Sequence, residues 1–261
     1  MATIQEPLPI IRSKKTGYGP YYSIYSFREV DKGPIAGSNC GSKFNRCRHQ
    51  GRLMMMDTPP NVVKTGTSTI GITFAGGVVV GADHRATMGH FIANKNVQKL
   101  FQIGENLALT TAGLVGHAQS LSRTLAAEIS LFELRRQQPM TVKGAATMTA
   151  NILVGKPHWV QLLIVGVDQD GGHVYSIDSA GGSIPDSYCA TGSGSPYMYG
   201  VLEDNYTDGM SRIEALKLAA RALYASGQRD AASGNGMDLA VITAKDGYQQ
   251  VSEQEISKLL K

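Results

Sequence analysis

Strand-forming segments occur in consecutive pairs in this sequence, and this order constrains the fold more than any other feature. Ser68–Phe74 and Val78–Asp83 are apolar and rich in β-branched residues, and Ala75-Gly76-Gly77 between them is typical of a hairpin turn. Lys99–Ile103 and Leu107–Ala112 form a second expected pair. Strands in runs, rather than in strict alternation with helices, predict an α+β fold of stacked antiparallel sheets with segregated helices.

Three longer helices and one short helix are expected among these strands. After Gly113 a helix of about 20 residues is expected, because apolar residues recur there at spacings of three and four. Those residues are Val115, Ala118, Leu121, Leu125, Ile129 and Phe132. A second helix is expected over Thr141–Leu153. A third starts near Ser211, which has capping-box spacing with Glu214.

The apolar face of the third helix consists of Ile213, Leu216, Ala219, Ala220 and Leu223. Ser252 and Glu255 repeat the capping-box spacing and predict a short terminal helix. The later strands are expected over Val160–Val167, His173–Ile177, Cys189–Thr191, Leu239–Thr243 and Gln249–Val251.

The basic charge of the chain is confined to its N-terminal part. Residues 1–66 contain ten Lys and Arg against four Asp and Glu, whereas residues 67–261 contain fifteen against seventeen. The globular part therefore gives no reason to infer a nucleic-acid partner. Residues 1–66 are rich in Gly, Pro, Ser and Tyr and are expected not to fold alone. The run Met54-Met55-Met56 offers alternative translation starts, so residues 1–53 are expected to be either a long extension or a mis-assigned start.

Cysteine use and apolar runs bear on the compartment. The three cysteines are an odd, sparse set, which argues against a disulfide framework and favours a reducing environment. Cys40, Cys47 and His49 lack the spacing of zinc modules, so no metal and no cofactor is expected. No apolar run is long enough to span a membrane, and the first 30 residues lack a signal-peptide pattern. A soluble, cytoplasmic protein without a membrane partner is expected.

The segment Lys64-Thr65-Gly66-Thr67-Ser68 suggests a specific chemistry. If the chain were cut between Gly66 and Thr67, one residue would carry both a nucleophilic hydroxyl and a free α-amine. An α-amine has a pKa of about 7.7–8, so it can act as a base near neutral pH. Taken alone, a loop threonine before a strand is the commoner explanation.

Other residues could support such a nucleophile, although each also has an ordinary explanation. Asp83 ends a strand, Lys99 begins one, and Gly113 could expose its N–H to an oxyanion before a helix. Two polar loops, Gly192-Ser193-Gly194-Ser195 and Gln228-Arg229-Asp230-Ala231-Ala232-Ser233-Gly234, add hydroxyl and carboxylate groups. The ordinary explanations are a solvated turn for Asp83, a surface lysine for Lys99, a tight turn for Gly113 and solvent-exposed polar loops for the last two segments.

Taken together, these motifs resemble the proteasome β subunits, most closely those of the archaeal type. The resemblance extends from Thr67 to the C-terminus and includes Gly66-Thr67-Ser68-Thr69, Asp83-His84-Arg85-Ala86-Thr87, Lys99, Ala112-Gly113 and the two polar loops. It implies an N-terminal-nucleophile hydrolase with a four-layer αββα sandwich. Residues 1–66 would be a propeptide removed by autolysis, and residues 67–261 would be the catalytic domain. Residues 1–53 have no counterpart in the family.

The resemblance also implies a role for each site residue. Thr67 is the expected nucleophile, and Gly66–Thr67 is the bond expected to cleave itself. Lys99 would lower the pKa of the hydroxyl, Asp83 would hold Lys99, and the Gly113 N–H would stabilise the oxyanion. Ser193, Asp230 and Ser233 would hold the amine and its water. The residues expected in the substrate pocket are Ala86, Val97, Thr111 and Val115, which favour cleavage after apolar residues.

The implied partners are other subunits and protein substrates. Seven copies would form a β ring, stacked on a second β ring and on rings of α subunits, with an ATPase regulator supplying unfolded polypeptides. Three alternatives remain open at this point. The chain could be another self-cleaving amidohydrolase, a non-catalytic structural ring subunit, or a protein whose residues 1–53 form a basic arm for nucleic acid or membrane.

Overall fold

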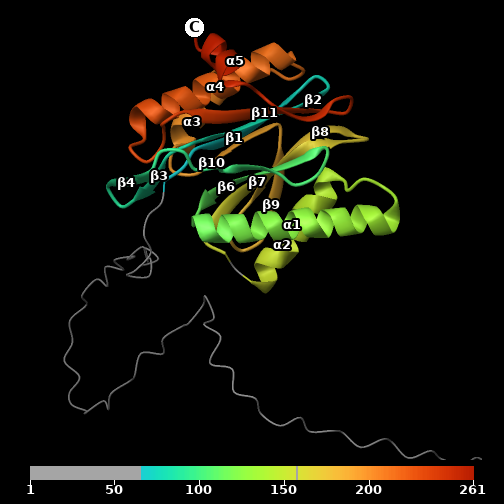
Figure 1. Cartoon of the computed structure of the whole chain (residues 1–261). Helices are drawn as coiled ribbons and strands as arrows, with labels where there is room; N and C mark the ends of the chain where they lie inside the picture. Colours follow the sequence, from blue (N-terminus) through green and yellow to red (C-terminus); the bar gives the residue numbers. More distant parts are fainter. Residues whose placement is uncertain (1–65, 157) are drawn as a thin grey trace, which may run out of the picture. The chain divides into compact units, whose positions relative to one another are not determined.

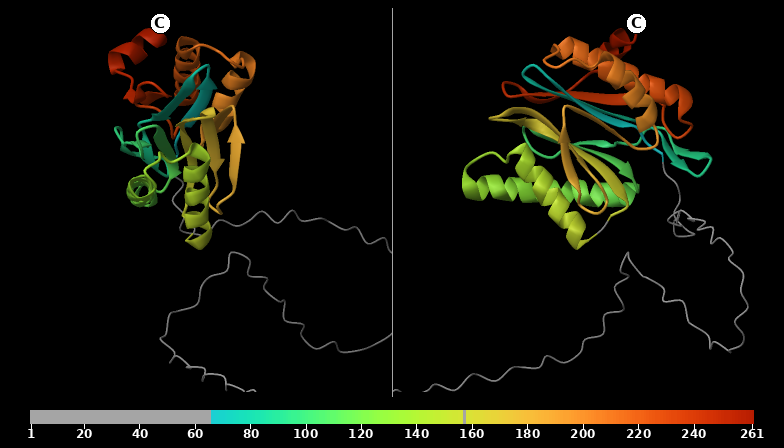
Figure 2. Two further views of the ribbon diagram at one scale, coloured as in Figure 1. Left: turned by 90° about the vertical axis from the view of Figure 1, so that its right-hand side faces the viewer. Right: turned by 180° about the vertical axis from the view of Figure 1, so that it is seen from behind.

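Two antiparallel sheets form the centre of the fold, and helices lie against the outer face of each sheet (Figure 1). This architecture comes from a computed structural model that describes residues 66–156 and 158–261. Figure 2 shows the layers in the order helix, sheet, sheet, helix. The four-layer αββα sandwich predicted from the sequence is therefore confirmed.

The first sheet carries the N-terminal end of the described chain. Its order is β10-β1-β2-β11-β12, and all neighbouring strands are antiparallel. Its strands are β1 (Thr69–Phe74), β2 (Gly77–Asp83), β10 (Tyr188–Thr191), β11 (Met237–Thr243) and β12 (Gly247–Gln250). The predicted hairpin forms between β1 and β2, because Phe74 pairs with Gly77 across a two-residue turn.

The second sheet has the order β5-β6-β7-β8-β9 and is also antiparallel. Its strands are β5 (Leu100–Gln102), β6 (Leu107–Gly113), β7 (Val160–Asp168), β8 (Gly171–Ile177) and β9 (Ser183–Asp186). A separate two-stranded ribbon, β3 (Ala86–Met88) and β4 (Phe91–Asn94), follows the end of β2.

Helices cover the two outer faces. They are α1 (Val115–Arg136), α2 (Val142–Gly155), α3 (Ser195–Asn205), α4 (Arg212–Arg229) and α5 (Glu253–Leu259). The capping box expected at Ser211 and Glu214 is present in both directions at the start of α4. At α5 the Ser252 hydroxyl accepts a hydrogen bond from the Glu255 N–H. No helix in the described residues is both long and apolar enough to cross a membrane.

The apolar core is divided by the sheets, and β1 and β2 show how the sequence produces this. Ile70 and Ile72 of β1 belong to the cluster between the first sheet and α3, α4 and α5. Val78 and Val80 of β2 point to the other side, into the cluster between the two sheets. Because alternate residues of a strand face opposite sides, a sheet buried on both faces needs apolar residues at consecutive positions. A third cluster, which includes Leu125, joins the second sheet to α1 and α2.

Several sequence-based expectations were incomplete. The helix α3, the β3–β4 ribbon and strand β9 were not predicted. The apolar stripe of α1 is buried in its middle, but Val115 and Phe132 at its ends are exposed. Ile213 of α4 is likewise exposed, whereas the other residues expected on that face are buried.

Candidate active site

Three chain segments that are distant in sequence meet where the two sheets face each other. Pairing of β1 with β2 places Thr69 opposite Ala82, so Thr67 and Ser68 come beside Asp83 at the end of β2. The Ser68 carbonyl accepts a hydrogen bond of 3.0 Å from the Asp83 N–H. Lys99 directly precedes β5 of the second sheet. The Lys99 carbonyl accepts a hydrogen bond of 3.0 Å from the Thr111 N–H. Ordinary strand pairing therefore brings Thr67, Asp83 and Lys99 together.

Lys99 and Asp83 form a buried ion pair. Their atoms Nζ and Oδ1 are 2.7 Å apart, and the two residues are only 5% and 2% exposed. Nζ also donates to the carbonyl oxygen of Arg85 at 2.5 Å. Burial lowers the pKa of Lys99 below its ordinary value, and the nearby charge of Asp83 opposes this shift without cancelling it. The lysine is thus held in place by two acceptors while the low-polarity surroundings disfavour its charge.

Asp83 is fixed by three backbone donors in addition to the lysine. The N–H of Ser68 donates to Oδ1 at 2.9 Å, and those of Arg85 and Gly234 donate to Oδ2 at 3.1 and 2.9 Å. A carboxylate that accepts several hydrogen bonds from rigid backbone has little freedom to rotate. The position of Lys99 is therefore set by the fold.

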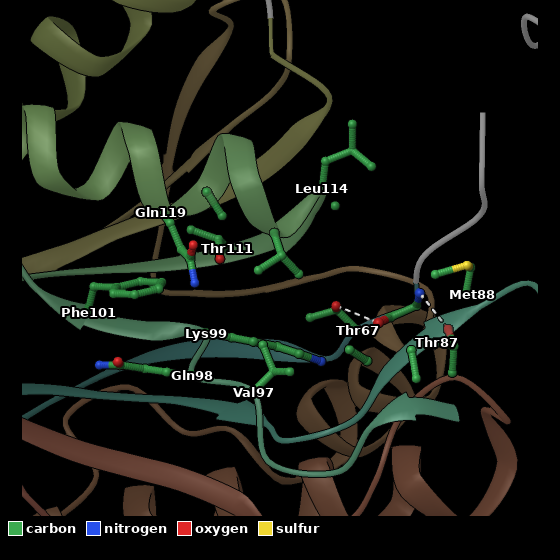
Figure 3. Close-up of a pocket in the computed structure, with 16 residues that line it drawn as sticks. Thr67, Thr87, Met88, Val97, Gln98, Lys99, Phe101, Thr111, Leu114 and Gln119 are labelled. Atoms are coloured by element: carbon green, nitrogen blue, oxygen red, sulfur yellow. Dashed lines mark hydrogen bonds between the residues drawn. The ribbon is translucent and has the colours of Figure 1, made fainter. Parts of the chain in front are cut away.

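Thr67 lies in the same buried space and is 4% exposed. Its hydroxyl donates a hydrogen bond of 2.6 Å to the carbonyl oxygen of Gly66, and its N–H donates to Ser193 Oγ at 3.1 Å. The Gly66 N–H in turn donates to Thr87 Oγ1 at 3.2 Å. Figure 3 shows the Thr67–Gly66 and Gly66–Thr87 hydrogen bonds, with the Lys99 side chain extending toward Thr67. The bond between Gly66 and Thr67 is thus held from both sides, with a hydroxyl beside it.

Gly66 occupies a position that leaves no room for a side chain. A Cβ atom built there would lie 1.8 Å from Ala232 Cβ and 3.0 Å from Ser193 Oγ. Since non-bonded carbon atoms stay about 3.5–4.0 Å apart, only glycine fits this geometry. The glycine before the threonine is therefore a structural requirement of the arrangement.

Ser193, Asp230 and Ser233, which the sequence predicted as one polar set, are brought together beside the Thr67 nitrogen. The hydroxyls of Ser193 and Ser233 each donate to Asp230 Oδ2 at 2.6 Å. Asp230 is the residue that ends α4, and its Oδ1 accepts from the Ala232 N–H at 3.1 Å. A single carboxylate at a helix end therefore orients both hydroxyls.

The polar set extends further than the sequence indicated. Ser68 Oγ lies 2.7 Å from Ser233 Oγ and also contacts Ser226 Oγ, and all three side chains are fully buried. Ser226 lies four residues before Asp230, one helical turn away on the same face of α4. That spacing was the available signal for Ser226. Nothing local in the sequence indicated the contact of Thr87 with Gly66.

A pocket of about 320 Å³ opens beside Thr67. All four residues predicted to line it do so: Ala86, Val97, Thr111 and Val115. Gly113 also lines it, with a φ of +124° and the Trp159 carbonyl packed where a Cβ would lie. Other lining residues that the sequence did not indicate include Met88, Phe101, Leu114, Ala118 and Gln119. Apart from Lys99 the lining residues that the structure describes are uncharged, so the pocket suits an apolar group (Figure 3).

No group of three or more His, Cys, Asp or Glu side chains that could hold a metal ion occurs within residues 66–156 and 158–261. The sequence hypothesis that considered Cys40, Cys47 and His49 as ligands concerns residues outside the described part. Within the described part, the site brings together the Thr67 hydroxyl, the Lys99–Asp83 ion pair and a network of hydroxyls around Asp230.

Comparison with known proteins adds independent information. The family described as "Proteasome subunit" matches residues 63–242. The chain is 48% identical over 199 residues to "Proteasome subunit beta" of Methanohalophilus mahii, covering 75% of this chain and 94% of that protein. It is 48% identical over 203 residues to the protein of the same name from Picrophilus torridus, covering 77% and 96%. The corresponding values for Archaeoglobus profundus are 47% over 202 residues, covering 76% and 94%.

Proposed function

This chain belongs to the proteasome β-subunit family, and we propose that it is a catalytic member, a threonine-type endopeptidase that first cleaves its own chain. One observation carries the proposal. The Thr67 hydroxyl lies 2.6 Å from the Gly66 carbonyl oxygen, in a buried site that also holds the Lys99–Asp83 ion pair. Because the nucleophile and the reacting carbonyl are already held this close together, little further conformational entropy is lost on reaching the transition state, which lowers the barrier to attack.

Self-cleavage begins with attack of Thr67 Oγ1 on the carbonyl carbon of Gly66. The C–N bond between the two residues breaks, the hydroxyl proton passes to the leaving nitrogen, and Gly66 becomes esterified to the threonine oxygen. Water then hydrolyses the ester. The products are a carboxylate on Gly66, a free hydroxyl on Thr67 and a free α-amine on Thr67. Residues 1–66 leave as a propeptide, and residues 67–261 form the mature subunit.

Turnover of substrate uses the same oxygen with a new base. The α-amine of Thr67 accepts the hydroxyl proton, directly or through water, as Oγ1 attacks the peptide carbonyl. The Lys99 ammonium favours the alkoxide electrostatically and disfavours protonation of the amine. The Gly113 N–H stabilises the oxyanion, a contribution of about 2.7–4 kcal/mol per donor in other enzymes. Ser193, Asp230 and Ser233 hold the amine.

The pocket beside Thr67 receives the side chain that precedes the cut. Its lining of Ala86, Val97, Thr111 and Val115 is small to medium in size and uncharged. Burial of an apolar side chain is favourable by about 25 cal/mol per Å² of surface, whereas an unpaired charge would be strongly disfavoured. The specificity supported by this lining is cleavage after apolar residues.

The family relationship supports a role inside a larger particle. Seven copies form a β ring that stacks on a second β ring and on rings of proteasome α subunits, and an ATPase regulator feeds unfolded polypeptides into the enclosed chamber. Such a site has little sequence discrimination, so enclosure protects folded proteins. The particle acts in the cytoplasm, consistent with the sparse cysteines of the chain.

The test is co-expression with the matching α subunit, followed by intact mass and peptidase measurements on the assembled particle. Wild-type particles should contain a chain that begins at Thr67. Thr67→Ala should remain uncut and inactive, whereas Thr67→Ser, which keeps a hydroxyl, should be cut and retain measurable activity. An active Thr67→Ala particle would refute the nucleophile assignment. A full-length, inactive wild-type subunit in the particle would instead assign the chain a structural role.

A further inference from the structure

His84 lies between Asp83 and Arg85, the two residues that supply both acceptors of Lys99. Its ring nitrogen Nε2 is 3.2 Å from Oδ1 of Asp238 in β11, and its side chain is only 13% exposed. It does not line the pocket beside Thr67. Its backbone is also engaged, because its carbonyl accepts a hydrogen bond of 2.9 Å from the N–H of Val97, which does line that pocket.

The same residue contacts the loop that follows Ser233. The His84 N–H is 3.2 Å from the Gly234 carbonyl oxygen and 3.3 Å from that of Gly236. A Cβ atom on Gly236 would lie 2.9 Å from His84 Nδ1, so the ring packs directly against the loop backbone. His84 thus touches three structures at once: the loop after Ser233, strand β11 and the segment that leads to Lys99.

We propose that His84, paired with Asp238, is a positioning residue for Lys99. It anchors the Asp83–Arg85 turn to β11, and that turn holds the lysine through Asp83 Oδ1 and the Arg85 carbonyl. The inference rests on the proposed catalytic role of Lys99. His84 acts through its neighbours, because it is not hydrogen-bonded to the hydroxyl of Thr67 and does not itself line the pocket.

The strength of this anchor depends on the charge of His84. The acidic groups that act on the ring are Asp238 from β11 and Asp83 from the end of β2. The guanidinium of Arg85, the next residue in the turn, is bound to Asn235 Oδ1 and to the Ala231 carbonyl. The hydrogen bond to Asp238 raises the pKa of His84 above 6.5, and burial opposes this shift without cancelling it.

A raised pKa sets the direction of the pH dependence. The ionic part of the contact is fully present below about pH 6.5, the unperturbed pKa, and is lost as the pH rises through the higher pKa of the folded protein. The neutral ring can still donate one hydrogen bond from Nε2 to Asp238, but a neutral donor binds a carboxylate more weakly than a charged one. The anchor therefore weakens at alkaline pH without disappearing.

The experiment measures kcat and KM of the assembled, self-processed particle on a short fluorogenic peptide with an apolar residue before the cut, from pH 5.5 to 9. His84→Gln keeps a donor but carries no charge at any pH. Its kcat should fall by up to about tenfold at pH 6 and approach that of the wild type by pH 9, with KM unchanged. Dividing kcat of the variant by kcat of the wild type at each pH cancels the effect of titrating groups that both proteins share.

Two further variants test charge and specificity. His84→Lys keeps a positive charge throughout this pH range. Its kcat at pH 6 should therefore equal that of the wild type, and its ratio to the wild type should not show the rise toward pH 9 that is expected for His84→Gln. His173→Gln is the matched control, because His173 pairs with Asp168 at 3.0 Å in the same way but lies in β8, outside the site. Its activity should equal that of the wild type at every pH.

Several outcomes would overturn the inference. A His84→Gln particle with wild-type kcat at all pH values would do so, as would a loss of kcat that is the same at every pH, since that indicates a merely structural role. If His84→Gln does not assemble, Asp238→Asn removes the charge from the other partner and should give the same pH-dependent loss. An inactive wild-type particle would refute the proposed function itself, whereas an active one with an unaffected His84→Gln would refute only this inference.

Discussion

Replacement of Gly66 by alanine tests how the bond before Thr67 is held. The added Cβ would lie 1.8 Å from Ala232 Cβ, 2.9 Å from Ala232 Cα and 3.0 Å from Ser193 Oγ. Because non-bonded carbons stay about 3.5–4.0 Å apart, one side must move by about 1.7–2.2 Å. Ala232 and Ser193 are both hydrogen-bonded to Asp230, so the wall is fixed. The peptide at Gly66 is therefore the part expected to move.

The expected size of the effect follows from the contacts that this movement breaks. Thr67 Oγ1 is 2.6 Å from the Gly66 carbonyl oxygen, and the Gly66 N–H is held by Thr87 at 3.2 Å. A misplacement of about 1 Å at a reacting centre can cost about 100-fold in rate. Self-cleavage of Gly66→Ala should therefore be at least about 100-fold slower than that of the wild type, while the fold of the subunit is unchanged.

The assay follows conversion of full-length to cut chain by intact mass during assembly with α subunits. A second variant isolates the cause. Gly66→Ala combined with Ala232→Gly removes the 1.8 Å clash and leaves only the two milder contacts of the added Cβ, near 3 Å, with Ala232 Cα and Ser193 Oγ. This double variant should be cut at least about tenfold faster than Gly66→Ala alone. Ala232→Gly alone is the control and should be cut at close to the wild-type rate. Wild-type cutting of Gly66→Ala, or no rescue in the double variant, would refute the reasoning.

Four further predictions concern other parts of the fold. Asp83→Asn leaves the buried Lys99 ammonium without its carboxylate; peptidase kcat should fall by about 10²–10⁴-fold and the unfolding free energy by about 3–5 kcal/mol in denaturant titration. Val97→Phe should fill part of the pocket and raise KM for peptides with a large apolar residue before the cut, with little change when that residue is alanine. Leu125→Ala, at a fully buried position on α1, should cost about 2–5 kcal/mol in the same titration. Burial raises the pKa of the Cys189 thiol to about 11, so iodoacetamide at pH 8 should not label it in the mature particle but should after denaturation.

Elements with strong local patterns were predictable from the sequence, and those without were not. The β1–β2 hairpin has β-branched strands and a glycine turn, and α4 has its capping box; both formed as predicted. Strand β9 is exposed along its whole length and contains a proline, so it has no apolar alternation to detect. Helix α3 begins after Gly194 without a side-chain cap. Pro196 in its first turn was the start signal that the polar-loop interpretation overlooked.

The candidate site shows the same division. Family motifs indicated Thr67, Asp83, Lys99 and the polar set. The structure pairs Lys99 with Asp83, links Thr67 to the polar set through Ser193, and places Thr67 and Lys99 along the same pocket. Arg85 shows what local reasoning could not reach, because its part in holding Lys99 is played by a backbone carbonyl rather than by its side chain. Contacts made through backbone atoms or across many residues leave no periodic signal in the sequence.

Under the proposed function, the hydrogen bonds of the uncut chain explain how one arrangement would serve both self-cleavage and turnover. Ser193 Oγ is 2.6 Å from the carboxylate of Asp230 but 3.4 Å from the carbonyl oxygen of Thr67, so its single proton goes to the carboxylate. What it offers the Thr67 nitrogen is therefore an acceptor. The amide N–H uses that acceptor before the cut, and an N–H of the free amine can use it afterwards. When the amine donates one of its N–H groups to Ser193 Oγ, its lone pair points away from Ser193 and can accept the proton of the Thr67 hydroxyl. The base that the proposed self-cleavage releases would thus already be oriented for turnover, without any rearrangement of Ser193 or Asp230.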